Sequence, residues 1–160
     1  MEGMETIKEA RAKFDSYDSN EWVKAFFDEC SGGFVVIEKI RVVQSEHSKN
    51  EKKKFEKEYG MCKVLARNGN TIEFLADKKG SYDIHFNGIT ADLKKTSSHN
   101  NVEKYAKDAI REQNAEIVIF EFENNTKEIH AKISKLVKTY NINGFYYFSE
   151  NPDIILTLKK

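Results

Sequence analysis

The sequence predicts an α/β (α+β) protein with a mixed central sheet and flanking helices. Three observations lead to this fold class. Apolar residues recur at helical spacing in several segments, β-branched and aromatic runs separate these segments, and a helix precedes a three-strand meander that is followed by another helix and strand. The chain has 160 residues, one proline and no low-complexity stretch. We therefore expect a single domain over residues 1–160.

The first half of the chain is expected to contain more helix than strand. Residues 4–15 and 20–30 have amphipathic patterns, which predict two helices and make residues 1–33 a helical N-terminal segment. The β-branched run 34–43 predicts a strand. Ser48 and Glu51 form a capping-box pattern, so a helix should begin there and end at Asn68-Gly69.

The second half alternates strands with helices. Residues 71–76, 82–86 and 89–95 predict three short strands, and Asn100 is expected to cap a helix that reaches about residue 114. The run 116–123 is the strongest strand signal in the chain. A helix should follow from Asn125 to residue 140, and the segments 145–148 and 154–158 predict a closing hairpin.

Charge and composition exclude several classes of protein. The chain has 26 Lys plus Arg and 26 Asp plus Glu, so no net basicity points to nucleic acid. Bases outnumber acids in residues 38–67, which leaves this block as the candidate anion-facing surface, although a solvated helix face would have the same composition. The longest apolar run, 117–120, is far below the ~20 residues of a membrane span. The N-terminus lacks the apolar core of a signal peptide.

The hairpin around Asn87-Gly88 brings together side chains that could bind a metal ion or take part in catalysis. A two-residue type I′ turn at Asn-Gly places Asp83 opposite Asp92, with Cβ atoms roughly 4.5–5.5 Å apart. Two converging carboxylates are costly on an ordinary sheet but suit Mg²⁺ or Mn²⁺. Lys94 lies on the same face, where it could activate a nucleophile or stabilise charge on a phosphate. The alternative is an exposed hairpin with a surface ion pair between Asp92 and Lys94.

These residues resemble the signature of the PD-(D/E)xK nuclease superfamily. The match is closest to the C-terminal tRNA-nuclease toxin domains of contact-dependent growth inhibition proteins, which pair a "pDi-x-x-nG" strand with a "w-E-x-K" strand. The corresponding segments are Ser81–Gly88 and Ala91–Lys94, preceded by the helix segment Glu58–Gly69 and followed by Ser97–Asn101 and Gln113–Ile119. The resemblance implies a restriction-endonuclease-like catalytic core over residues 48–123.

The resemblance also implies a site and a reaction. Glu58, Asp83 and Asp92, with the backbone carbonyl of Leu93, would hold Mg²⁺ (or Mn²⁺), and Lys94 would position the attacking water. Asp92 stands where glutamate is usual, Tyr82 replaces the proline, and Cys62 replaces a small alanine, which puts the helix register in question. Glu56 and Glu51 therefore compete with Glu58, which is favoured because it shares the apolar stripe of Cys62 and Leu65.

The resemblance further implies an RNA substrate, in particular tRNA, and a cognate immunity protein as partner. Such a toxin acts in a bacterial cytoplasm after delivery as the C-terminal part of a larger surface or secreted protein. Four polar residues are candidates for contact with the substrate: His85, His99, Asn101 and Gln113. Each has a purely structural alternative: a cross-strand hydrogen bond to Thr90 for His85, a place in a helix start for His99 and Asn101, and exposure to solvent for Gln113.

Two other functions remain open at the level of sequence. A metal-independent ribonuclease toxin could use His85, His99 and Lys94 to transfer the phosphate to the 2′-hydroxyl. A non-catalytic mobile-element or partner-binding protein could keep the same fold without turnover. Activity in excess EDTA would distinguish the first of these from a metal-dependent enzyme, and binding to a partner without any cleavage would identify the second.

Overall fold

The structure is a computed structural model that describes residues 2–159. The chain forms two compact units, which are described separately. The first contains residues 1–77 and 84–88, and the second contains residues 78–83 and 89–160. The predicted core, residues 48–123, is thus divided between the two units.

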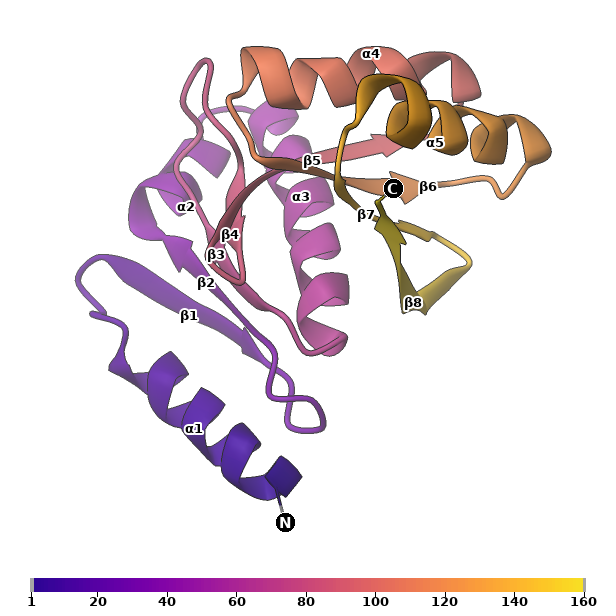
Figure 1. The fold of residues 1–160 in the computed structure, drawn as a ribbon. Helices are drawn as coiled ribbons and strands as arrows, with labels where there is room; N and C mark the ends of the chain where they lie inside the picture. Colours follow the sequence, from indigo (N-terminus) through magenta and orange to yellow (C-terminus); the bar gives the residue numbers. More distant parts are fainter. Residues whose placement is uncertain (1, 160) are drawn as a thin grey trace. The chain divides into compact units, whose positions relative to one another are not determined.

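The first unit contains three helices and four strands, shown in indigo to magenta in Figure 1. Its elements are α1 (Glu2–Ser16), β1 (Trp22–Phe27), β2 (Phe34–Glu38), α2 (Lys39–Ser45), α3 (Lys49–Arg67), β3 (Thr71–Phe74) and β4 (Ile84–Phe86). The strands pair in the order β1-β2-β3-β4. β2 and β3 are parallel, while the two outer pairs are antiparallel.

Helices cover both faces of the β1–β4 sheet. Phe34 and Val36 of β2 point to one face, where they pack with Phe14 of α1. The other face carries Phe74 of β3, whose ring stacks on Phe55 of α3 with centroids 5.4 Å apart. Burying aromatic residues on both faces explains why β2 is apolar at nearly every position rather than alternating.

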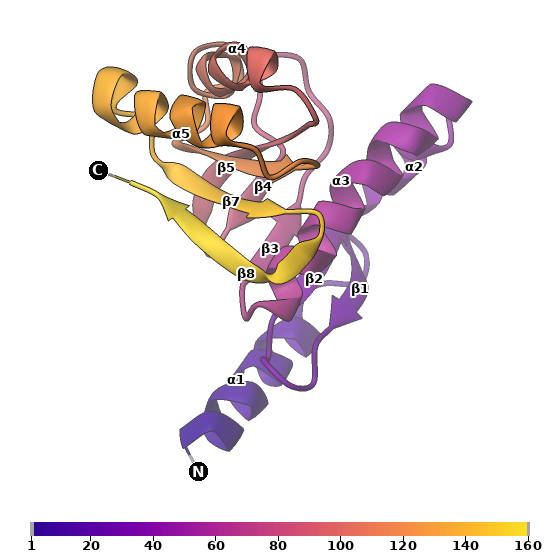
Figure 2. The ribbon, with the colours of Figure 1, turned by 90° about the vertical axis from the view of Figure 1, so that its right-hand side faces the viewer.

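The second unit contains four strands and two α-helices with short helical extensions. Its elements are β5 (Ile89–Thr96), a 3₁₀ turn η1 (His99–Asn101), α4 (Val102–Lys107), a π-helical turn η2 (Asp108–Glu112), β6 (Ile117–Phe122), α5 (Lys127–Tyr140), β7 (Gly144–Phe148) and β8 (Asn151–Leu158). The order is β5-β6-β7-β8, with β5, β6 and β7 parallel and β8 antiparallel to β7. Figures 1 and 2 show α4 and α5 side by side on one face of these strands.

The predicted fold class is confirmed, because each unit contains a sheet of both parallel and antiparallel pairs flanked by helices. The type I′ turn is supported by its backbone, since Asn87 has φ 50° and Gly88 has φ 85°. No helix in residues 2–159 is long and apolar enough to cross a membrane.

Two predictions in the first unit are wrong. Residues 20–30 contain strand β1 instead of a helix, so the N-terminal segment 1–33 is not wholly helical. A bulge between Lys24 and Phe26 breaks the two-residue alternation, which made the aromatic spacing resemble a helix. The predicted strand 34–43 ends at Glu38, and α2 begins at Lys39. The helical turn buries Arg41 while Ile40 and Val43 remain exposed.

Helix caps were predicted with mixed success. Ser48 caps α3 as expected, because its hydroxyl accepts a hydrogen bond from the N–H of Glu51. Asn100 is not a cap, because Ser98 takes that role by accepting from the N–H of Asn100. At the start of α5, Thr126 rather than Asn125 accepts the capping hydrogen bond from the N–H of Ile129.

Candidate active site

Asp92 is a buried carboxylate on β5, with only 2% of its surface exposed. It pairs across the parallel ladder with Val118, whose side chain belongs to the apolar core beneath α4 and α5. Because paired residues of adjacent strands point to the same face, Asp92 lies on the helix-covered face of the second unit. Burial of this carboxylate favours the site interpretation over an exposed surface ion pair.

Lys94 lies two residues further along β5, on the same face. Its Nζ is 3.0 Å from Asp92 Oδ2 and 2.9 Å from Asp108 Oδ2, and it lies 5.8 Å from the ring centre of Tyr105. Burial alone would lower the pKa of Lys94, but Asp108 and Asp92 together hold this pKa above its usual range. Lys94 is therefore an ammonium at neutral pH.

Asp83 lies beside β5 immediately before β4. Its N–H donates to the carbonyl of Ala91 at 3.1 Å, and its Oδ2 accepts from the N–H of Leu93 at 2.7 Å. The hairpin therefore brings Asp83 alongside the stretch of β5 from Ala91 to Leu93, and the predicted pairing of Asp83 directly opposite Asp92 stays a prediction. One carboxylate oxygen of Asp83 faces the backbone between Asp92 and Lys94, an arrangement that the sequence does not reveal.

The donor set of Asp83 and Asp92 fits a hard divalent cation. Asp92 Oδ2 is buried beside the Lys94 ammonium, yet no donor among the described residues is aligned to form a hydrogen bond with it. Burying a carboxylate oxygen is costly; the Lys94 ammonium at 3.0 Å offsets part of this cost, and a bound divalent cation would offset more of it. Within residues 2–159, however, no group of three or more His, Cys, Asp or Glu side chains is arranged to hold a metal. Two carboxylates and a backbone carbonyl are the ligands that remain.

Glu58 lies in the first unit, in the middle of α3. It is buried on the stripe with Cys62 and Leu65, as expected, whereas Glu56 is exposed and Glu51 is partly buried near the helix start. Its Oε1 accepts from Arg41 Nη2 at 3.1 Å. Burial raises the pKa of Glu58, and the Arg41 guanidinium opposes this rise. Its predicted role as a metal ligand stays a prediction, and the structure adds a partner that the sequence did not indicate.

Arg41 is the largest fully buried side chain of the described residues. Its guanidinium carbon lies 5.3 Å from the ring centre of Phe55 and 5.0 Å from that of Phe74, so two aromatic faces and Glu58 surround the charge. Arg41 Nη1 has no hydrogen-bond partner among the described residues. Sequence reasoning missed Arg41 because it was assigned to a strand, where it would not have been expected to meet α3.

His85 belongs to a three-residue chain in the first unit. Its Nδ1 lies 2.8 Å from Glu73 Oε1, and the hydroxyl of Tyr17 donates to Glu73 Oε2 at 2.8 Å. Partial burial, followed by the contact with Glu73, raises the pKa of Tyr17. Glu73 thus fixes the orientation of the imidazole. Thr90, the partner considered from sequence, instead donates to Glu116 in the second unit.

The other candidate substrate residues have structural roles in the second unit. Asn101 donates from Nδ2 to Thr96 Oγ1 at 3.2 Å, which ties the end of β5 to the start of α4. His99 opens the 3₁₀ turn η1 and is partly exposed. The N–H of Gln113 donates to the carbonyl of Asp108, which closes the π-helical turn. Their predicted contacts with substrate remain predictions.

Sequence reasoning also missed Asp108 and Tyr105, which contact Lys94 from the π-helical turn η2 and from α4. Their only signal was a three-residue spacing within a helical pattern, which places them on one helix face. Comparison with known protein families, curated proteins and solved structures finds no match to this chain. The nuclease resemblance therefore depends on its motifs and on the geometry described above.

Proposed function

We propose that this protein is a metal-dependent endonuclease that hydrolyses phosphodiester bonds in RNA. One observation carries this proposal: the buried Asp92 Oδ2 lacks a hydrogen bond and lies 3.0 Å from the ammonium of Lys94, with Asp83 bonded to the residue between them. A buried acid and a lysine two residues apart on one strand, with a second carboxylate on the segment beside it, are parts that metal-assisted phosphodiester hydrolysis can use.

Each residue has a distinct task in this proposal. Asp83 and Asp92, with the carbonyl of Leu93, would hold Mg²⁺ or Mn²⁺, which supplies positive charge and polarises the attacked phosphate. Lys94, kept protonated by Asp92 and Asp108, orients the attacking water and stabilises negative charge that develops on the phosphate. Glu58, which lies in the first unit, is the third carboxylate that the resemblance implies, and Arg41 opposes the rise in its pKa that burial causes.

The choice of RNA, and of tRNA in particular, comes from the resemblance to contact-dependent growth inhibition toxins. On that basis we propose that the domain acts in a bacterial cytoplasm after delivery by a larger protein, and that a cognate immunity protein blocks it. The net charge of zero is compatible with this, because a bound cation adds positive charge that composition does not count.

Cleavage of total tRNA tests the proposal. We expect cleavage with Mg²⁺ and none in excess EDTA. Asp92→Ala and Lys94→Ala should each abolish cleavage. The first variant should stay folded because Asp108 still neutralises Lys94, whereas the second leaves the buried Asp92 without its counter-charge, so its folding is checked by circular dichroism. Lys95→Ala is the matched control: Lys95 is the next residue on β5 and forms an ion pair with Glu121, away from Asp92. Cleavage that persists in both the Asp92→Ala and the Lys94→Ala variant would contradict the assignment.

A second candidate is a metal-independent ribonuclease, favoured by the contact between His85 and Glu73. A carboxylate on Nδ1 sets the tautomer and the orientation of an imidazole, which suits general acid–base catalysis. In that case cleavage would persist in EDTA, and Glu73→Gln would reduce it. Loss of all cleavage in EDTA eliminates this candidate.

A further inference from the structure

A surface groove follows α4 and its π-helical extension in the second unit. It has a volume of about 270 Å³ and is lined by Lys104, Lys107, Asp108, Arg111 and Glu112. A π-helical turn changes the direction of side chains relative to an α-helix, and such turns are frequent at functional sites. This turn carries Asp108, whose carboxylate also contacts Lys94. The groove and the proposed active site therefore share a residue.

The groove has an excess of available positive charge. Lys104, Lys107 and Arg111 make no ion pair with any described residue, whereas nearby Glu103 is already held by Lys132 and Lys135. The two acids of the groove are Asp108, which shares the Lys94 ammonium with Asp92, and Glu112. The lining thus has three cations against two carboxylates, one of which is already in an ion pair.

The position of Lys107 is fixed by packing. Its Nζ lies 4.1 Å from the ring centre of Tyr140 on α5, a cation–π contact that restricts the side chain. Lys104, Lys107 and Arg111 all line the groove, so the three cations occupy one side of α4 and its π-helical extension. Such a row of charges matches a chain of phosphates better than a single small anion.

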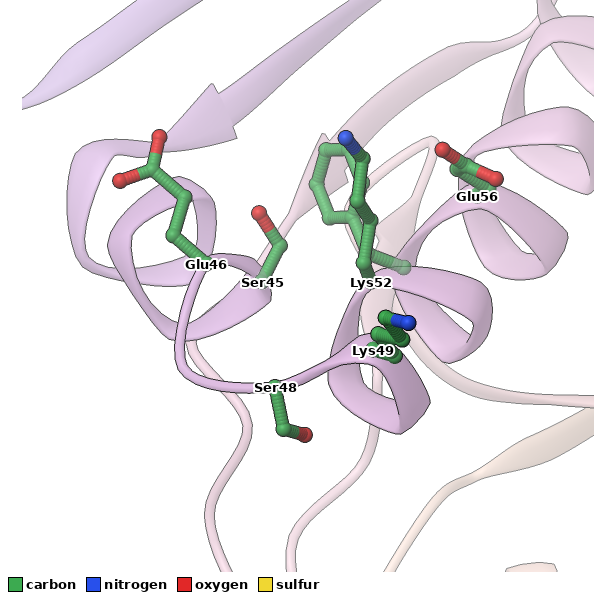
Figure 3. Close-up of a pocket in the computed structure, with 7 residues that line it drawn as sticks. Ser45, Glu46, Ser48, Lys49, Lys52 and Glu56 are labelled. Atoms are coloured by element: carbon green, nitrogen blue, oxygen red, sulfur yellow. The ribbon is translucent and has the colours of Figure 1, made fainter.

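A larger cleft in the first unit does not have this property. Figure 3 shows its lining at the turn between α2 and α3, where Lys49 and Lys52 are accompanied by Glu46 and Glu56. Its volume is about 480 Å³, but its charges balance, so it offers no preference for an anion. The cleft between α2 and α3 therefore lacks the excess of cations that the α4 groove has.

We propose that the groove of Lys104, Lys107 and Arg111 binds backbone phosphates of an RNA strand next to the phosphate at Lys94. The choice of RNA, and the location of the bound strand relative to the reacting phosphate, rest on the proposed function; the cationic groove itself does not. Contacts to phosphates add affinity without reading the sequence, so the groove would align a strand while other features select the bond.

Salt-dependent binding tests this proposal. We would titrate the full chain into a fluorescein-labelled single-stranded RNA in EDTA, where a metal-dependent enzyme cannot cleave, and follow anisotropy at several KCl concentrations. Replacing Lys104, Lys107 and Arg111 together by Gln should weaken binding at least tenfold and lower the slope of log K against log[KCl] by about 2, as expected for three phosphate contacts on a single strand. Lys104→Arg with Lys107→Arg should retain binding.

Two triple variants to Gln complete the experiment. The first changes Lys8, Lys127 and Lys138, which are exposed and unpaired among the described residues, and it should leave the slope unchanged. The second changes Lys49, Lys53 and Lys57, the exposed row on α3, and should also leave it unchanged. An equal loss in either variant, an unchanged slope in the groove variant, or no binding by the natural chain overturns the proposal. Should the groove variant unfold, Arg111→Gln alone must lower the slope by about 0.7.

The outcome separates this proposal from the nuclease assignment. RNA binding that depends on the groove, without cleavage in Mg²⁺, would support the groove and reject the enzyme. Cleavage by the natural chain, with equal cleavage and equal binding by the groove variant, would support the enzyme and reject the groove.

Discussion

The most unusual residue of the first unit is Arg41, a fully buried cation whose only carboxylate partner among the described residues is Glu58. Taking both charges out of water is expensive, and the pair recovers this cost only while both members are present. Removing one member leaves an uncompensated buried charge. The stability of the first unit should therefore depend strongly on Glu58, whatever its part in catalysis.

Glu58→Gln is expected to lower the free energy of unfolding by about 3–5 kcal/mol, because Arg41 loses its counter-charge. Chemical denaturation followed by circular dichroism measures this. Glu56→Gln, on the exposed side of the same helix, is the matched control and should change stability by less than about 0.5 kcal/mol. The double variant Arg41→Met, Glu58→Leu should recover most of the loss. Similar free energies of unfolding for Glu58→Gln and Glu56→Gln would show that the ion pair contributes little.

At the scale of elements, Glu103 joins α4 to α5. Its carboxylate accepts hydrogen bonds from Lys132 and the Tyr140 hydroxyl, and it forms a second ion pair with Lys135. Hydrogen bonds from Lys135 and then Lys132 lower the pKa of Glu103 to about 2, from an ordinary value of 4.5. A short helix such as α4 gains little from its own hydrogen bonds, so contacts of this kind hold it in place.

The lowered pKa of Glu103 predicts a defined pH dependence. Between pH 4.5 and about 2 the unfolded chain binds more protons at this residue than the folded chain, so its stabilising contribution is present above this window and is lost as pH falls through it. Glu103→Gln should therefore lower the melting temperature at neutral pH, and the difference from the natural chain should vanish near pH 2. Glu112 is an exposed acid in the π-helical turn that follows α4, and Glu112→Gln should have the melting temperature of the natural chain at both pH values.

Elements were predictable where a local pattern decided them. The periodicity of α3 and the apolar run that opens β6 needed no tertiary information, and Asn87-Gly88 specified its own turn. β1 was missed because a bulge altered its alternation, and α2 was missed because its start depends on the burial of Arg41 rather than on propensity.

The site was predictable only along a single hairpin. Counting from the turn placed Asp83 near Asp92 and Lys94, because strand register is a local property. Asp108 reaches Lys94 from a helix that lies 14 residues away in sequence, and the partnership of Arg41 with Glu58 spans 17 residues. In each pair the two residues lie on different elements, so no repeat within one helix or strand could reveal these contacts.

At the scale of the whole molecule, neither unit is a continuous stretch of chain. The chain leaves the first unit after Asp77, contributes residues 78–83 to the second, and returns for residues 84–88. The returning segment adds β4 to the first unit, where it forms an antiparallel pair with β3. Gly80, at the middle of the excursion, has a φ of 74°, which a glycine adopts without strain.

This interleaving has a consequence for proteolysis. A specific protease site inserted between Lys79 and Gly80 would cut the chain into two fragments, and the C-terminal fragment would still carry β4 of the first unit. Backbone hydrogen bonds between β3 and β4, with those that Asn87 makes to Thr71, should then hold the fragments together. We expect them to co-elute on gel filtration in buffer and to separate in denaturant; separation in buffer would contradict this. A cut chain of this kind would behave as a split protein that reassembles by completing a sheet.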